Sequence, residues 1–131
     1  MILSAILSPA PDVEPLRAAV AAVESRQGGR PPWEMSREEQ RQLAGLAAEY
    51  LRARGARRVR LFGSLARGRA PGVHSDFDLA VEGLPQEAFL GCLGTLLQIL
   101  PLPVDLVELE SASPALRERI LENGIVLSHE D

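Results

Sequence analysis

The spacing of apolar residues predicts two helices in the first part of the chain. Between residues 12 and 27 they recur at helical spacing, and the Gly-Gly pair that follows is a C-terminal stop. A second helical run follows Ser36, which has Glu39 three residues later as in a capping box, and it ends near Gly55. We therefore expect two helices before the first strand.

Shorter apolar runs in the rest of the chain predict strands at residues 58–62, 76–82 and 104–109. A stretch at 86–100, apolar and nearly free of proline, predicts a buried helix. Ser113 followed by Pro114 supplies the N-cap and first turn of a last helix, which Gly124 ends.

Length and composition fit a folded chain with its own core. The 131 residues are 46% hydrophobic and 24% charged, which is ordinary for a globular domain. Residues 28–32 are rich in Gly and Pro and predict a linker. We therefore expect a helical arm at 1–32 and a main domain at 33–131.

The charge pattern narrows the possible chemistry. A formal net charge of -4 argues against a general nucleic-acid binder, so no direct nucleic-acid binding is expected. All 14 basic residues are arginines, which excludes every mechanism that needs a lysine. A phosphate group would have to meet arginine, backbone N–H groups or a metal ion.

Cys92 is the single cysteine, which excludes an internal disulfide and fits a reducing compartment. The apolar start of the chain is short and runs into prolines, so it makes a poor signal peptide. No apolar run approaches the roughly 20 residues of a membrane span. We expect a soluble, cytoplasmic protein.

The residues with the clearest chemical meaning are a Gly-Ser turn and three acids. Gly63 and Ser64 follow a predicted strand, and Asp76 and Asp78 are two residues apart on the next, so their side chains share one face. Asp105 lies among apolar residues of the third strand, where a carboxylate needs a cation or hydrogen-bond partners.

Three acids from adjacent strands can hold one or two Mg²⁺ ions, which prefer carboxylate oxygens, water and phosphates. Gly63 allows close approach of a triphosphate, and Ser64 offers a hydroxyl and an N–H near a predicted helix start. Arg67, and with less support Arg69, can meet a phosphate. These parts suit phosphoryl or nucleotidyl transfer, with Asp105 as the candidate for accepting or relaying the proton of the attacking hydroxyl.

In this order, Gly63, Ser64, Asp76, Asp78 and Asp105 resemble the motif of the minimal nucleotidyltransferase family of the DNA polymerase beta superfamily, and in particular its MntA-like antitoxins. The likeness covers residues 59–109, and residues 122–127 look like the family's usual ending. The resemblance implies an α/β (α+β) fold, a small mixed sheet flanked by helices, which agrees with the predicted order of elements.

The resemblance also implies an activity and a partner. It implies an Mg²⁺-dependent nucleotidyltransferase, with two ions and ATP as substrate, that moves AMP to a hydroxyl, that of a tyrosine, on a HEPN ribonuclease toxin in a hetero-oligomer. The implied catalytic and metal-binding residues are Asp76, Asp78 and Asp105, and the implied nucleotide-binding residues are Gly63, Ser64 and Arg67. Two alternatives stay open: an antitoxin that neutralises the toxin by binding alone, and transfer to a small molecule or RNA.

Five arginines gather near the end of the second helix, at positions 52, 54, 57, 58 and 60. A solvated helix end is favourable there because cations stabilise the negative end of the helix dipole. A surface that meets RNA, an acidic partner or the nucleotide phosphates is the alternative.

Overall fold

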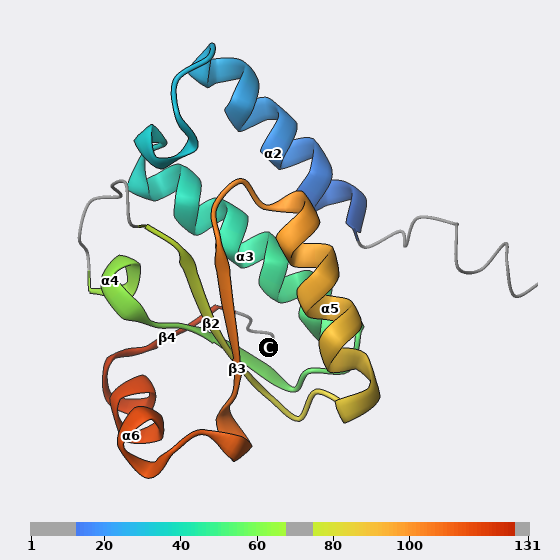
Figure 1. Ribbon diagram of the computed structural model, residues 1–131, viewed down its shortest axis with the longest axis vertical. Coiled ribbons are helices and arrows are strands. Elements are labelled where there is room, and N and C mark those ends of the chain that lie inside the picture. The colour runs from blue at the N-terminus through green and yellow to red at the C-terminus, as the bar shows by residue number, and fades with distance from the viewer. Residues whose placement is uncertain (1–12, 68–74, 128–131) are drawn as a thin grey trace, which may run out of the picture.

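The computed structural model describes residues 13–67 and 75–127, in which three helical segments precede the first strand and further helices separate the strands that follow (Figure 1). In chain order the elements are α2 (Glu14–Gln27), η2 (Pro32–Glu34), α3 (Arg37–Ala53), β1 (Arg58–Leu61), α4 (Gly63–Ala66), β2 (Phe77–Glu82), α5 (Gln86–Ile99), β3 (Val104–Glu108), η3 (Leu109–Ser111), α6 (Pro114–Asn123) and β4 (Ile125–Val126). Residues 1–12, residues 68–74 with Arg69, and residues 128–131 lie outside the described residues.

The predicted helix ends are confirmed. Gly28 ends α2 in the left-handed conformation, with φ of 56°. Ser36 and Glu39 form the capping box of α3: Ser36 Oγ accepts from the Glu39 N–H at 3.0 Å, and Glu39 Oε1 accepts from the Ser36 N–H at 3.0 Å. Ser113 caps α6 by accepting from the Leu116 N–H at 3.2 Å.

The described strands form one sheet in the order β3-β2-β1-β4. β1 runs antiparallel to β2 and β4, whereas β2 and β3 are parallel, and α5 lies between these two strands in the sequence. A parallel pair needs such a crossover connection. The predicted class, a small mixed sheet flanked by helices, is therefore confirmed.

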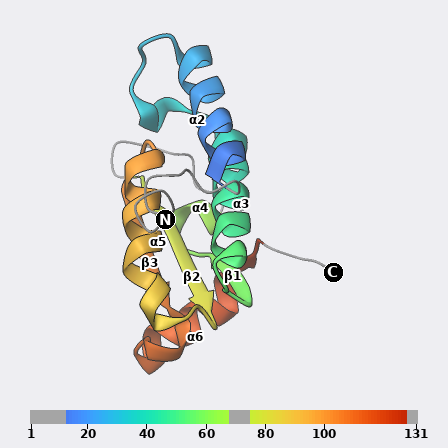
Figure 2. The ribbon, with the colours of Figure 1, turned by 90° about the vertical axis from the view of Figure 1, so that its right-hand side faces the viewer.

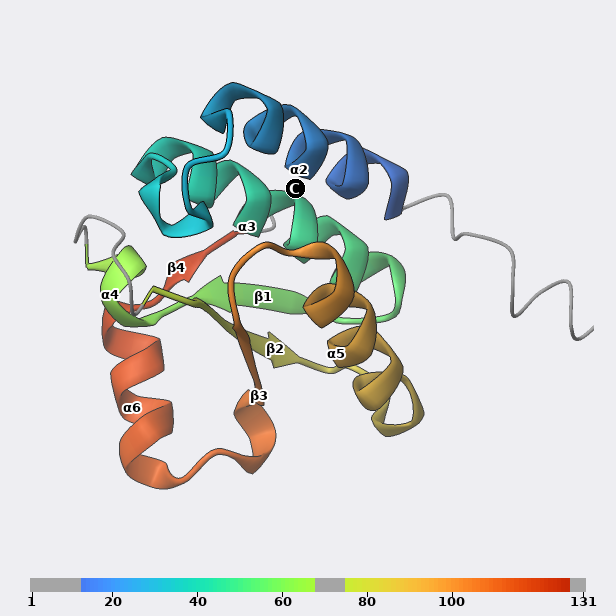
Figure 3. The same ribbon diagram turned by 45° about the horizontal axis from the view of Figure 1, so that its top comes forward.

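The two faces of the sheet carry different partners because successive side chains alternate. One face, which includes Val59, Leu79 and Leu106, forms the main core with α2, α3 and α5. On the other face Ala80 forms a smaller cluster with Leu109 and with Ile120 of α6. Figure 2 shows α3 beside β1 and α5 beside β3, and in Figure 3 α6 lies on the far side of the sheet from α2.

The helix at 86–100 is present as α5, but the prediction that it is buried is wrong. Cys92, Leu96 and Ile99 are buried, whereas Leu90 is 77% exposed and Leu97 is 51% exposed. A helix that lies on one face of a sheet buries a single side, so an apolar residue on its outer side stays accessible.

Three strand boundaries also differ from the prediction, and the first is that β1 ends at Leu61 and not at residue 62. β2 begins at Phe77, so Asp76 precedes the strand that it was expected to open. β3 ends at Glu108, and Leu109 begins the short helix η3. β4 was not predicted as a strand, because two residues are too few to show alternation.

α2 contributes Leu16, Val20 and Val23 to the same apolar cluster as α3 and β1. The division into an arm at 1–32 and a main domain at 33–131 stays a prediction. None of the helices in the described ranges has both the length and the hydropathy of a membrane-spanning helix.

Candidate active site

A pocket of about 320 Å³ lies where β1 gives way to α4. It is lined by residues that are far apart in the sequence: Phe62, Gly63, Ser64, Arg67, Asp78, Leu116, Arg119, Ile120 and Asn123. The three residues predicted to bind a nucleotide and one of the three predicted acids therefore line the same cavity.

Gly63 and Asp78 are in direct contact in this pocket. Gly63 has φ of +80°, which side chains other than glycine rarely adopt. A Cβ at this position would overlap Asp78 Oδ2 and lie 2.9 Å from Asp78 Cγ. The Phe62 N–H also donates to Asp78 O at 2.9 Å, which fixes the turn against β2. Glycine is therefore required at 63 both by the backbone and by the space that the carboxylate fills.

The structure brings the three predicted acids together. Asp105 on β3 is the direct register partner of Asp78 on β2, so the two side chains share a face of the sheet. The pKa of Asp78 is raised to about 7 chiefly by burial, and then by its side-chain hydrogen bond with Asp76 and by the negative charges of Asp76 and Asp105, while the charge of Arg67 acts in the opposite direction. Negative charge is thus concentrated at this end of the sheet.

The donor set fits a hard divalent cation, because carboxylate oxygens are the ligands that Mg²⁺ prefers. Within residues 13–67 and 75–127, however, no group of three His, Cys, Asp or Glu side chains is arranged to hold a metal ion. Mg²⁺ is usually bound by one or two carboxylates together with water and substrate phosphates, so an incomplete set of protein ligands is compatible with it. The metal-binding and catalytic roles of Asp76, Asp78 and Asp105 stay predictions.

The contribution of α6 to this pocket was not predicted from the sequence. Leu116, Arg119, Ile120 and Asn123 recur at helical spacing, so one face of α6 closes the cavity opposite Gly63 and Ser64. Arg119 adds a second guanidinium to that of Arg67. Helical spacing shows which residues of α6 share a side of the helix, but not which side contacts the Gly-Ser turn.

Gln40 of α3 was also missed. Its side chain is 1% exposed, and its Nε2 donates to the backbone carbonyl of Asp76 at 3.3 Å. The neighbouring Arg41 donates from Nη2 to Leu65 O at 3.4 Å and so contacts α4. Two adjacent residues of α3 therefore hold the start of β2 and the Gly-Ser turn relative to each other.

Comparison with known proteins identifies the family. Residues 47–131 match the family described as "Polymerase beta, Nucleotidyltransferase". Curated protein sequences give no significant match.

Several solved structures are similar. A structure described as a minimal nucleotidyltransferase is 33% identical with a TM-score of 0.60, and the match covers 70% of this chain and 96% of that one. A toxin-antitoxin structure with AMP-PNP is 32% identical with a TM-score of 0.53, covering 61% and 68%. A complex of tri-AMPylated Shewanella oneidensis HEPN toxin with MNT antitoxin is 28% identical with a TM-score of 0.53, covering 69% and 73%. With the family match spanning most of the sequence, the chain belongs to the polymerase beta nucleotidyltransferase family, and within it to the minimal nucleotidyltransferases.

Proposed function

We propose that this nucleotidyltransferase moves AMP from ATP to a hydroxyl, that of a tyrosine, on a partner HEPN ribonuclease and so acts as an antitoxin. The observation that carries the proposal is the contact of Gly63 with Asp78 in one pocket with Ser64 and Arg67. It is further supported by two similar structures, one with AMP-PNP and one containing an AMPylated HEPN toxin. Such a target implies a cytoplasmic location.

Asp76, Asp78 and Asp105 would hold Mg²⁺, and the proposal includes two ions. When bound, Mg²⁺ supplies positive charge that offsets the charge of the phosphates and of the leaving pyrophosphate. The crowding of the three carboxylates is what makes this assignment reasonable, because a cation would relieve their repulsion.

The protein's own groups would position the phosphates of ATP and deprotonate the attacking hydroxyl. Ser64 and Arg67 bind the phosphates through a hydroxyl and a guanidinium fork, and Gly63 leaves the backbone open to them. Asp105 accepts the proton of the attacking hydroxyl. A bond forms between the acceptor oxygen and the α-phosphorus, the bond from that phosphorus to the bridging oxygen breaks, and pyrophosphate leaves.

The test uses the purified chain with a HEPN ribonuclease partner and ATP radioactively labelled in its α-phosphate. We expect label on the partner, dependence on Mg²⁺, and loss of label when the acceptor tyrosine is replaced by phenylalanine. Mass spectrometry of the partner identifies the modified side chain.

Other outcomes of this experiment separate the alternatives. A partner that is inhibited without becoming labelled contradicts the proposal and favours an antitoxin that acts by binding. Label on RNA or on a small molecule in place of the partner keeps the chemistry and changes the acceptor.

Gln40→Met is expected to lower kcat on the order of tenfold with little change in the KM for ATP, because the carbonyl of Asp76 loses its donor and the acid shifts. Gln27→Met is the matched control, since Gln27 is also buried and donates from Nε2 to a backbone carbonyl, that of Pro31, at 3.4 Å. Each variant should lose about 1 kcal/mol of stability. Equal loss of activity in both variants would show that Gln40 is merely structural.

A further inference from the structure

A second pocket, of about 370 Å³, lies at the opposite end of the strands from the active-site pocket. The Arg57 N–H donates to Glu82 O at one end of the β1–β2 pairing, and the Phe62 N–H donates to Asp78 O at the other. The second pocket is lined by four arginines, two glutamates and two leucines: Arg57, Arg58, Arg60, Glu82, Leu109, Glu110, Arg117 and Leu121. It is therefore a separate, basic site.

Three of these arginines converge on one carboxylate. Arg57 Nη2 lies 3.6 Å and Arg58 Nη1 3.8 Å from Glu82 Oε1, and Arg60 Nη1 donates to Glu82 Oε2. Burial alone would raise the pKa of Glu82, but the hydrogen bond from Arg60 and the charges of all three arginines hold it below its usual value. One carboxylate balances one guanidinium, so the group keeps an excess of positive charge.

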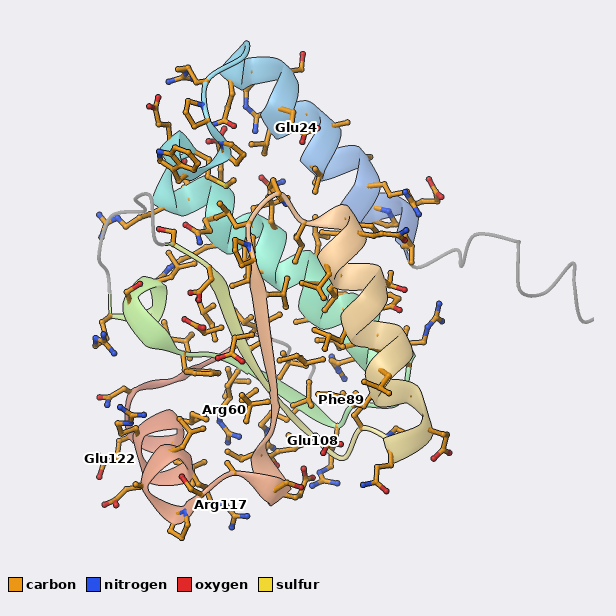
Figure 4. All side chains as sticks on the ribbon, in the orientation of Figure 1. Glu24, Arg60, Phe89, Glu108, Arg117 and Glu122 are labelled. Atoms are coloured by element: carbon orange, nitrogen blue, oxygen red, sulfur yellow. The ribbon has the colours of Figure 1, made fainter. Side chains whose placement is uncertain are left out.

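The fourth arginine comes from α6. Figure 4 shows Arg60 and Arg117 extending from β1 and α6, and both line the pocket. Arg117 is held in place, because its Nε donates to Leu109 O at 3.2 Å and its Nη2 to Glu110 O at 2.8 Å. Glu110 accepts from the Gly83 N–H at 2.6 Å. Four arginines against two glutamates leave two positive charges in a chain whose formal net charge is -4.

The positive charge is accessible. The side chains of Arg57 and Arg58 are 68% and 47% exposed, whereas that of Arg60 is 14% exposed. Repulsion between neighbouring guanidiniums raises the free energy of the pocket, and an anion placed among them lowers it. The two outer arginines are thus available to an anionic group while Arg60 keeps Glu82 paired.

An apolar hollow of about 410 Å³ adjoins this pocket across Arg117 and Leu121, which line both. Its other lining residues are Ala112, Pro114, Glu118 and Glu122. Leu121 is 50% exposed. A ligand that spans the two would meet positive charge first and an apolar surface next.

The geometry points to a docking site for an acidic segment of a partner protein, with a carboxylate between Arg57 and Arg58 and the following apolar side chain against Leu121. Guanidinium forks match the planar geometry of a carboxylate, and the adjoining hollow provides the apolar contact. Because this site lies away from Asp78, the inference does not depend on the proposed reaction.

RNA fits this surface less well. None of the residues that line the arginine pocket is aromatic, so bases have no stacking platform there. Glu118 and Glu122 border the adjoining hollow and would repel a phosphodiester backbone that continued along it.

The test selects a phage-displayed library of randomised peptides on the full-length protein and then measures binding of the enriched peptide, made synthetically. We expect enrichment of acidic residues followed by apolar ones. Arg57→Gln combined with Arg58→Gln should weaken binding about tenfold, and added salt should weaken it further. Leu121→Ser should weaken it independently of salt.

The control replaces Arg17 and Arg30, which lie outside both pockets, by glutamine and removes the same charge. It should leave binding unchanged. The inference is overturned if no peptide is enriched, if the enriched peptides lack acidic residues, or if both double variants lose binding equally. If a single-stranded RNA oligonucleotide binds more tightly than the peptide, and the double variant of Arg57 and Arg58 loses that binding, the pocket is a nucleic-acid site instead.

Discussion

Asp78→Asn should lower the rate of nucleotidyl transfer about a thousandfold, since ~4 kcal/mol of charge stabilisation at the transferring phosphate corresponds to three factors of ten. Asp78 is the acid that lines the active-site pocket and touches Gly63. Pyrophosphate release measures the effect. Glu108→Gln is the matched control, because Glu108 lies on β3 in register with Val81, a residue of the opposite face, and should keep full activity.

The same variant should be more stable than the natural protein at high pH. The pKa of Asp78 is raised to about 7 in the folded state from 3.8, so the folded protein binds this proton more tightly than the unfolded chain. The resulting cost is absent below about pH 4, grows as the pH rises to about 7, and persists above it. A rise of this size corresponds to at most ~4 kcal/mol, and partial exposure of the side chain reduces that to about 1 kcal/mol.

Urea unfolding with a chelator present measures this difference. Asp78→Asn should gain about 1 kcal/mol at pH 8 and nothing at pH 4. If Asp78→Asn is inactive and also less stable at pH 8, the loss of activity is explained by misfolding. The catalytic assignment of Asp78 would then be contradicted.

Gly63→Ala should reduce transfer about a hundredfold and the free energy of unfolding by about 2 kcal/mol. The added methyl group would lie 2.9 Å from Asp78 Cγ at a residue whose φ is +80°, so the turn or the carboxylate must move. Steady-state kinetics and urea unfolding measure the two effects. Gly45→Ala is the matched control, because a Cβ there meets nothing within 4 Å and Ala favours the helix.

A double-mutant cycle separates the contact from the backbone strain. If the clash with Asp78 contributes, Gly63→Ala and Asp78→Ala should destabilise less together than the sum of their separate effects. Strict additivity would contradict the contact and leave backbone strain as the whole cause.

Local patterns predicted much of this fold. The capping box of Ser36 and Glu39, the stop at Gly28 and the N-cap at Ser113 lie where the sequence indicated. They are predictable because each depends on residues within one helical turn. The central strands were likewise identified, with small errors at their ends.

Features that depend on distant packing were missed. The exposure of Leu90 follows from which side of α5 meets the sheet, and that is a tertiary property. Arg119 and Gln40 belong to helices far in sequence from the Gly-Ser motif, so spacing alone could not connect them to it. The motif predicted that Gly63, Ser64 and Asp78 lie together, whereas the position of Arg119 beside them depends on how α6 packs.

The position of β3 at the end of the strand order has a consequence for substrate size. Asp105 lies on this outermost described strand and is exposed, so no other described strand stands between it and that margin of the sheet. Under the proposed function, a folded partner protein could therefore present its acceptor side chain to Asp105 from the edge of the sheet, with no separation of the described strands.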